Sequence, residues 1–256
     1  IKFVAAVVSG SSVMFSEALH SVADTSNQVL LLIGLARSRK QADEDFSYGY
    51  GRERFFWAIL SACGIFFVGA GVTVYRGIIS VLDPEPVAFS PLVFGVLLIA
   101  FVVELFTLLV AARELQRSHP TQSWRERLTA GDPSTLAVLL EDGVAVCGVL
   151  VAAAAIGLSY LTDNHLWDAV GSIVVGCLLG VTAVLLIVKH RGYLIGKSMP
   201  DDIRDDVVAI LTADPAIERV LDFKSTVLNV GVYRVKCEVE INGHALLNEY
   251  FHESLE

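Results

Sequence analysis

The sequence VMFSEALHSVADTSNQVLLLIGLA, residues 13–36, decides the fold of this chain. It is mostly apolar and exceeds the length of about 20 residues that a helix needs to cross the hydrocarbon core of a bilayer. Four polar residues interrupt it at spacings of three, four and three: Glu17, His20, Asp24 and Asn27. At about 100° per residue, these side chains share one stripe that is roughly a quarter of the helix circumference. The stretch is therefore predicted to be a membrane helix with one polar face.

Four further apolar runs of similar length follow, and residues 1–10 look like the end of a first helix whose beginning is missing. The runs cover residues 55–82, 91–112, 134–161 and 166–188. The chain is 54% apolar and 18% charged, against about 45–50% and about 25% in soluble domains. We therefore predict an α-helical membrane protein, a six-transmembrane-helix bundle with a truncated first helix over residues 1–189. This composition excludes a predominantly soluble enzyme, and a net charge of −9 disfavours a nucleic-acid partner.

The loops between these runs predict the orientation in the membrane. Lys and Arg gather in residues 37–54, 113–127 and 189–197, whereas residues 82–90 and 160–165 contain neither. Because Lys and Arg are enriched on the cytoplasmic side of membrane proteins, both ends of the chain are expected in the cytoplasm or its topological equivalent. The expected product is a multi-pass protein of the lipid bilayer.

Residues 190–256 read as an ordinary soluble sequence. An amphipathic stretch begins at Pro200, residues 217–228 resemble a strand, and VYRVKCEVEI, residues 232–241, alternates apolar and polar side chains. A helix followed by a strand pair predicts a small cytoplasmic α+β domain, ferredoxin-like and cut short at its end.

Ionisable side chains inside the apolar runs indicate a functional site, because they are costly in a membrane. His20 and Asp24 lie one turn apart, so an imidazole nitrogen and a carboxylate oxygen can reach one cation, of which zinc or a similar first-row ion is typical. A helix-packing hydrogen bond between the two is the alternative. Glu141 and Asp142 lie about 100° apart on the fifth span, so one is expected to meet the stripe and the other a neighbouring helix or a water path. Glu104 is a third isolated acid.

No Lys or Arg is expected at comparable depth to neutralise these acids. A cation that comes and goes, either a metal ion or protons, is then the simplest counterion. Asp168, at the start of the sixth span, is expected to be a helix N-cap or first-turn acid.

Longer strings add a resemblance. EALHSVADTSNQ (17–28), DPSTLAVLLEDGVAVCGVL (132–150), WDAVGSIVVGCLLG (167–180) and LIGKSMP (194–200) are similar to the cation diffusion facilitators. That resemblance implies export of divalent metals in exchange for protons. It also implies a transport site between the second and fifth helices, where His20, Asp24 and Asp142 match family positions, and a tail that forms a homodimer.

One position departs from that family. Most zinc members carry a histidine four residues before the fifth-helix aspartate, but here Val138 stands there and cannot ligate. Glu141, Asn27, a water molecule or a shift in helix register could complete the site, and we rank Glu141 first. Selectivity among zinc, manganese, iron and cobalt stays open. The candidate metal ligands are His20, Asp24, Asp142, Glu141 and Asn27, and the candidate proton carriers are Glu104, Glu141 and Glu17.

We thus expect a divalent metal transporter, zinc being its first cargo, that exports metal from the cytoplasm against protons by alternating access. No permanently bound cofactor is expected. An enzyme is disfavoured because the HExxH motif is absent, and a non-transporting membrane metal sensor or scaffold is the alternative. The compact tail and the lack of a histidine-rich loop favour a bacterial inner (plasma) membrane over an organelle.

Overall fold

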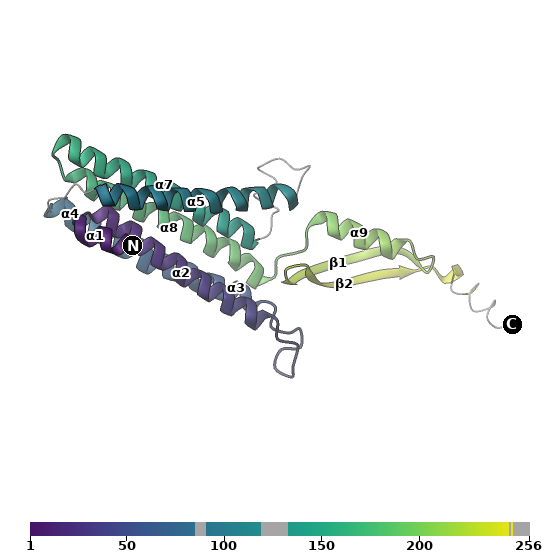
Figure 1. Ribbon diagram of the computed structural model, residues 1–256. Helices are drawn as coiled ribbons and strands as arrows, with labels where there is room; N and C mark the ends of the chain where they lie inside the picture. The colour runs from purple at the N-terminus through teal and green to yellow at the C-terminus, as the bar shows by residue number, and fades with distance from the viewer. Residues whose placement is uncertain (85–90, 119–132, 246, 248–256) are drawn as a thin grey trace.

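The computed structural model describes residues 1–84, 91–118, 133–245 and 247. Its elements form a long helical bundle from which a smaller unit of one helix and two strands projects (Figure 1). In chain order they are α1 (Lys2–Ser9), α2 (Ser12–Ser38), α3 (Glu53–Gly64), the π-helix η1 (Ile65–Gly71), α4 (Val72–Leu82), α5 (Pro91–Ser118), α7 (Pro133–Thr162), α8 (Leu166–Ile195), α9 (Asp201–Thr212), β1 (Ile217–Asn229) and β2 (Val232–Ile241).

The helices lie where the apolar runs predicted them, and the predicted fold class is confirmed. Among the described helices, four spans are long and apolar enough to cross a membrane: 53–82, 91–117, 138–162 and 166–195. The third span is one continuous helical rod made of α3, η1 and α4. α2 has 27 residues and is not among the four, which follows from the polar stripe within it.

α8 occupies the middle of the bundle and packs against α2, α3, η1, α4 and α7, whereas α5 packs against α1 and α7. Glycines allow α8 its close contacts. A Cβ at Gly171 would lie 2.5 Å from the Cβ of Ala155 on α7, and a Cβ at Gly176 would lie 2.6 Å from a methyl group of Val74 on α4. Small residues at such contacts are typical of helices that pack within membranes.

A tight turn joins α1 to α2. Gly10 adopts a left-handed conformation, with φ of 66°, which glycine tolerates without steric cost. Asp168 then caps the start of α2: its carboxylate accepts hydrogen bonds from Ser11 Oγ at 2.5 Å and from the backbone N–H of Ser12 at 2.6 Å. Asp168 lies in the first turn of α8, as predicted, but the helix that it caps is α2.

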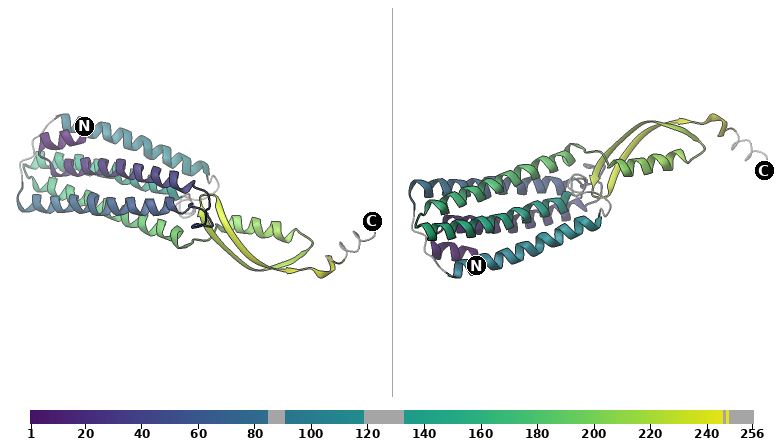
Figure 2. Two further views of the ribbon diagram at one scale, coloured as in Figure 1. Left: turned by 90° about the horizontal axis from the view of Figure 1, so that it is seen from below. Right: turned by 90° about the horizontal axis from the view of Figure 1, so that it is seen from above.

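The projecting unit follows α8, which ends at Ile195. β1 and β2 form an antiparallel hairpin, with Gly231 at φ 69° in its turn, and α9 packs against β1 (Figure 2). The loop between α2 and α3 lies at the same end of the bundle as this unit (Figure 1). Two of the basic residues used to predict orientation, Arg125 and Arg127, lie outside the described residues.

Candidate metal-transport site

The polar stripe of α2 faces the interior of the bundle. The side chain of His20 is 3% exposed, and its Nε2 lies 3.4 Å from Asp24 Oδ2. Within the described part of the chain, neither ring nitrogen of His20 has a hydrogen-bond partner. A buried polar atom without a hydrogen-bond partner is costly, so this imidazole is a candidate ligand for a cation.

Glu104 of α5 joins this pair. One ligand atom each from His20, Asp24 and Glu104 lie within 4.8 Å of one another. From the sequence alone we predict Glu104 to be a proton carrier, because nothing in the sequence indicates which face of the fourth span meets α2. The structure brings it to the two residues of α2 that were predicted to bind metal.

Glu141, which we ranked first to complete the site, lies in a different set of contacts. Its Oε2 accepts a hydrogen bond of 2.6 Å from Asn27 Nδ2. Asn27 Oδ1 in turn accepts one of 2.5 Å from Ser61 Oγ of α3. Glu141 is therefore the acid of α7 that meets the α2 stripe, and Asn27 ties α2 to both α3 and α7.

Asp142 points toward a neighbouring helix, as expected for the second acid of the pair. Its side chain contacts Thr107 of α5, and it lies within electrostatic range of His20 and Asp24. One of its oxygens, Oδ2, is buried without a hydrogen-bond partner in the described structure. Asp142 is not a member of the group of atoms within 4.8 Å, although it lines the same region.

The expectation that no basic residue lies at this depth is wrong. Lys2 of α1 reaches into the bundle, where its Nζ lies 2.9 Å from Glu104 Oε1 and 3.4 Å from Glu17 Oε2. The sequence did carry a signal for this. Lys2 stands eight residues before Gly10 and Glu17 seven after it, so a helical hairpin at Gly10 brings both to the same depth.

The charged groups therefore follow one another along α2, over a rise of about 15 Å. Lys2 with Glu17 lies toward the end of the bundle that is remote from the tail. His20, Asp24 and Glu104 occupy the middle, and Asn27 with Glu141 lies toward the tail. A cation that entered from the tail side would meet Glu141 first and Lys2 last.

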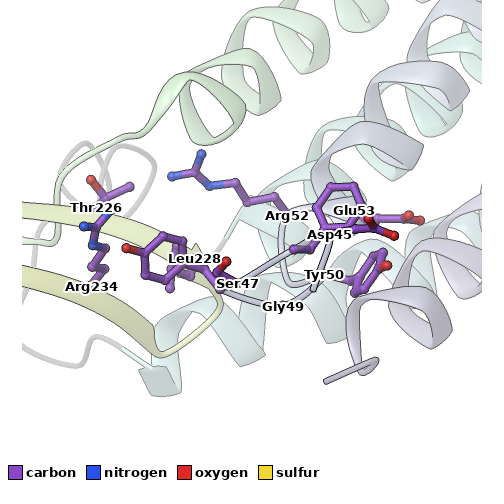
Figure 3. A pocket seen from close by; sticks show the side chains of 11 residues that line it. Asp45, Ser47, Gly49, Tyr50, Arg52, Glu53, Thr226, Leu228 and Arg234 are labelled. Carbon is purple, nitrogen blue, oxygen red and sulfur yellow. The ribbon is translucent and has the colours of Figure 1, made fainter. Parts of the chain in front are cut away.

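A separate cavity of about 630 Å³ lies where the bundle meets the tail. Figure 3 shows its lining from the loop before α3 and from the two strands, including Ser47, Arg52, Thr226 and Arg234. No predicted metal ligand lines it. The cavity belongs to the junction between the two parts of the chain and not to the cluster in the bundle.

A helical bundle with long apolar spans that encloses an imidazole and several carboxylates defines this chain as a multi-pass membrane protein with ionisable side chains in its interior. Comparison with known proteins gives the particular family. Residues 1–195 match the cation efflux transmembrane domain, and the chain belongs to the cation efflux family, the cation diffusion facilitators named by the resemblance.

Individual relatives agree with this. The chain is 38% identical over 252 residues to the proton-coupled zinc antiporter SLC30A9, mitochondrial, of Mus musculus, which covers 97% of this chain and 44% of the relative. It is 38% identical over 253 residues to metal tolerance protein C4 of Arabidopsis thaliana, and the match covers 98% of this chain and 55% of that protein. It is 24% identical over 253 residues to the cation-efflux pump FieF of Shewanella oneidensis, and this match covers 97% of this chain and 79% of that protein. The chain thus spans less than half the length of the SLC30A9 proteins that it matches.

Proposed function

We propose that this protein exports divalent metal ions, zinc first among them, from the compartment that holds its tail, in exchange for protons. The observation that supports this is the cluster of His20, Asp24 and Glu104 inside the bundle, where both nitrogens of a buried imidazole lack hydrogen-bond partners among the described residues. The names of the relatives, a proton-coupled zinc antiporter and cation-efflux pumps, agree with this chemistry.

In this proposal His20 and Asp24 are the primary ligands of the transported ion. Zinc prefers four ligands in tetrahedral geometry. Glu104, with an oxygen within 4.8 Å of both primary ligands, and Asp142, with a buried oxygen that has no hydrogen-bond partner among the described residues, can supply the others. The ligands must lose their protons to bind metal, so metal binding and proton release are linked. Exchange of metal against protons then needs only that the site opens alternately to the two sides. Glu141, on the tail side of the cluster, and Glu17, on the side remote from the tail, are proposed proton carriers.

Metal flux into proteoliposomes tests this function. The vesicles are loaded with a dye that responds to divalent metals, and zinc, manganese, iron and cobalt are offered with and without a pH gradient. We expect zinc uptake that falls sharply when the gradient is removed. Binding of metal without flux for any of the four ions would contradict the transporter and support the alternative, a metal sensor or scaffold.

The site assignment is tested by two alanine variants. We expect Asp24→Ala and Asp142→Ala each to reduce zinc flux to the level of empty vesicles while the protein still inserts, because each removes a carboxylate from the path of the cation. Asp83→Ala, at the exposed end of α4, is the matched control and should transport normally. Normal transport by either of the first two variants would refute the assignment.

The proposal also covers assembly and location. We propose that residues 1–189 form the transmembrane domain, that the tail from residue 190 joins two copies of the chain into a homodimer, and that the protein lies in a bacterial plasma membrane. The SLC30A9 relatives are named as mitochondrial, and the FieF relatives come from Shewanella oneidensis and Klebsiella pneumoniae. Light scattering of the purified protein in detergent tests the dimer.

A further inference from the structure

We propose that Lys2 competes with the transported cation: its ammonium group pairs with Glu104 and must release that carboxylate before Glu104 can bind a metal. This rests on the proposed transport function and adds to it a residue that sets the affinity for the cargo. Lys2 thereby acts on the metal through Glu104, and is a positioning residue.

The geometry gives one carboxylate two kinds of contact. Glu104 accepts a hydrogen bond of 2.9 Å from Lys2 Nζ. One of its carboxylate oxygens also belongs to the group within 4.8 Å that includes His20 and Asp24. The side chains of Lys2 and Glu104 are only 14% and 15% exposed, so water screens their attraction weakly.

Glu17 makes the exchange possible. Its side chain is fully buried, its Oε2 lies 3.4 Å from Lys2 Nζ, and its Oε1 has no hydrogen-bond partner in the described structure. When Glu104 turns to a metal ion, Lys2 keeps Glu17 as its partner, so the ammonium is not left as an unpaired buried charge, which would be strongly unfavourable. A lysine with one carboxylate could not release it as readily.

This pairing has a consequence for transport. A divalent ion at the cluster is repelled by the ammonium beside Glu104, so Lys2 weakens metal binding and thereby speeds metal release.

Zinc binding to the purified protein in detergent tests this, with Lys2→Met as the first variant. We expect the zinc Kd to fall by about tenfold or more, the order expected for removal of one competing charge from a site mostly shielded from water. In proteoliposomes both KM and kcat for zinc should fall, because tighter binding slows release. A purely structural defect would not lower KM. Lys40→Met, in the loop after α2, is the control and should leave all three quantities unchanged.

A second variant covers the case in which Lys2→Met does not fold. Lys2→Met combined with Glu17→Gln removes one positive and one negative charge, so the net charge of the buried cluster is kept, and it should also bind zinc more tightly. An unchanged or raised zinc Kd in the variant that folds would overturn the proposal. In Glu104→Gln, Lys2→Met should no longer tighten binding, as a double-mutant cycle requires if Lys2 acts through Glu104.

The two hypotheses fail separately in this design. Zinc flux in the wild-type protein with an unchanged Kd in Lys2→Met would overturn the role of Lys2 and leave the transporter standing. Absent flux in the wild-type protein with a lowered Kd in Lys2→Met would contradict the transporter and support the competition at Glu104.

Discussion

At the scale of single residues, the buried acids divide into structural and functional ones by what they contact. Asp168 accepts hydrogen bonds from Ser11 Oγ and from the backbone N–H groups of Ser12 and Val13, so both of its carboxylate oxygens bond to the start of α2. Asp142 has a buried oxygen without a hydrogen-bond partner among the described residues. The first acid stabilises a helix, and the second is the one that we propose as a ligand of the cation.

Asp168→Ala should therefore lower the stability of the protein rather than its chemistry. Loss of several charge-assisted hydrogen bonds at a buried helix start should reduce the free energy of unfolding by about 3 kcal/mol. Thermal unfolding in detergent, followed by tryptophan fluorescence, measures this, with the exposed Asp83→Ala as control. Equal Tm values for the two variants would show that the cap is dispensable.

At the scale of elements, α8 depends on glycine where it meets its neighbours. A side chain at Gly171 would collide with Ala155 of α7 and approach Val13 of α2 to 3.3 Å. Gly157 of α7, by contrast, has no heavy atom within 4 Å of an added Cβ. Gly171 of α8 is thus required for close packing, whereas Gly157 of the adjacent helix α7 has no steric role.

Alanine substitutions should separate these two glycines. Gly171→Ala should destabilise the bundle by about 1–3 kcal/mol, because the added methyl group overpacks the contact between α7 and α8. Gly157→Ala should be neutral or stabilising by up to about 1 kcal/mol, since alanine has the higher helix propensity. Denaturation of both variants under one set of conditions checks this, and a stable Gly171→Ala protein would mean that the helices can move apart at no cost.

The loop between α2 and α3 is ordered by charged contacts outside the membrane. Lys40 and the hydroxyl of Tyr50 donate hydrogen bonds to Asp43, at 2.7 Å and 2.8 Å, and they lower the pKa of its carboxyl group from 3.8 to about 2. A lowered pKa means that these contacts stabilise the loop fully above pH 3.8 and lose their effect as the pH falls through about 2.

Carboxyl carbon chemical shifts of Asp43, followed through a pH titration, should show a midpoint near 2 in the wild-type protein. In Lys40→Met the midpoint should return toward 3.8, because the main hydrogen-bond donor is gone. A wild-type midpoint near 3.8 would show that the loop does not hold this arrangement in solution.

At the scale of the whole molecule, this loop and a small aromatic core join the bundle to the tail. Phe55 of α3 stacks on Tyr193 of α8 with ring centroids 4.8 Å apart, and both pack with Val227 of β1. A Cβ at Gly51 would lie 2.5 Å from the carbonyl oxygen of Leu228. The tail thus packs against the ends of α3 and α8, beside the cavity of Figure 3.

Gly51→Ala should weaken the packing of the tail against the bundle, because the new methyl group meets the backbone oxygen of Leu228, which cannot move without shifting β1. Protease cleavage between α8 and α9 should become several-fold faster, since exposed connecting segments are the preferred sites of nicking. Gly243→Ala, where an added Cβ meets nothing within 4 Å, is the control. Equal cleavage rates in both variants would show that Gly51 does not hold the tail.

The sequence by itself determined the helical spans, the polar stripe of α2, the α+β character of the tail and the membership of a metal-exporting family. These features depend on local periodicity and hydrophobicity, which read directly from residue order. Only the tertiary structure decided that Glu104 joins His20 and Asp24, that Glu141 pairs with Asn27, and that Lys2 neutralises two of the acids. The physical reason is that these contacts link different helices, and the rotation of each helix about its axis is set by packing against its neighbours, which hydrophobic runs do not specify.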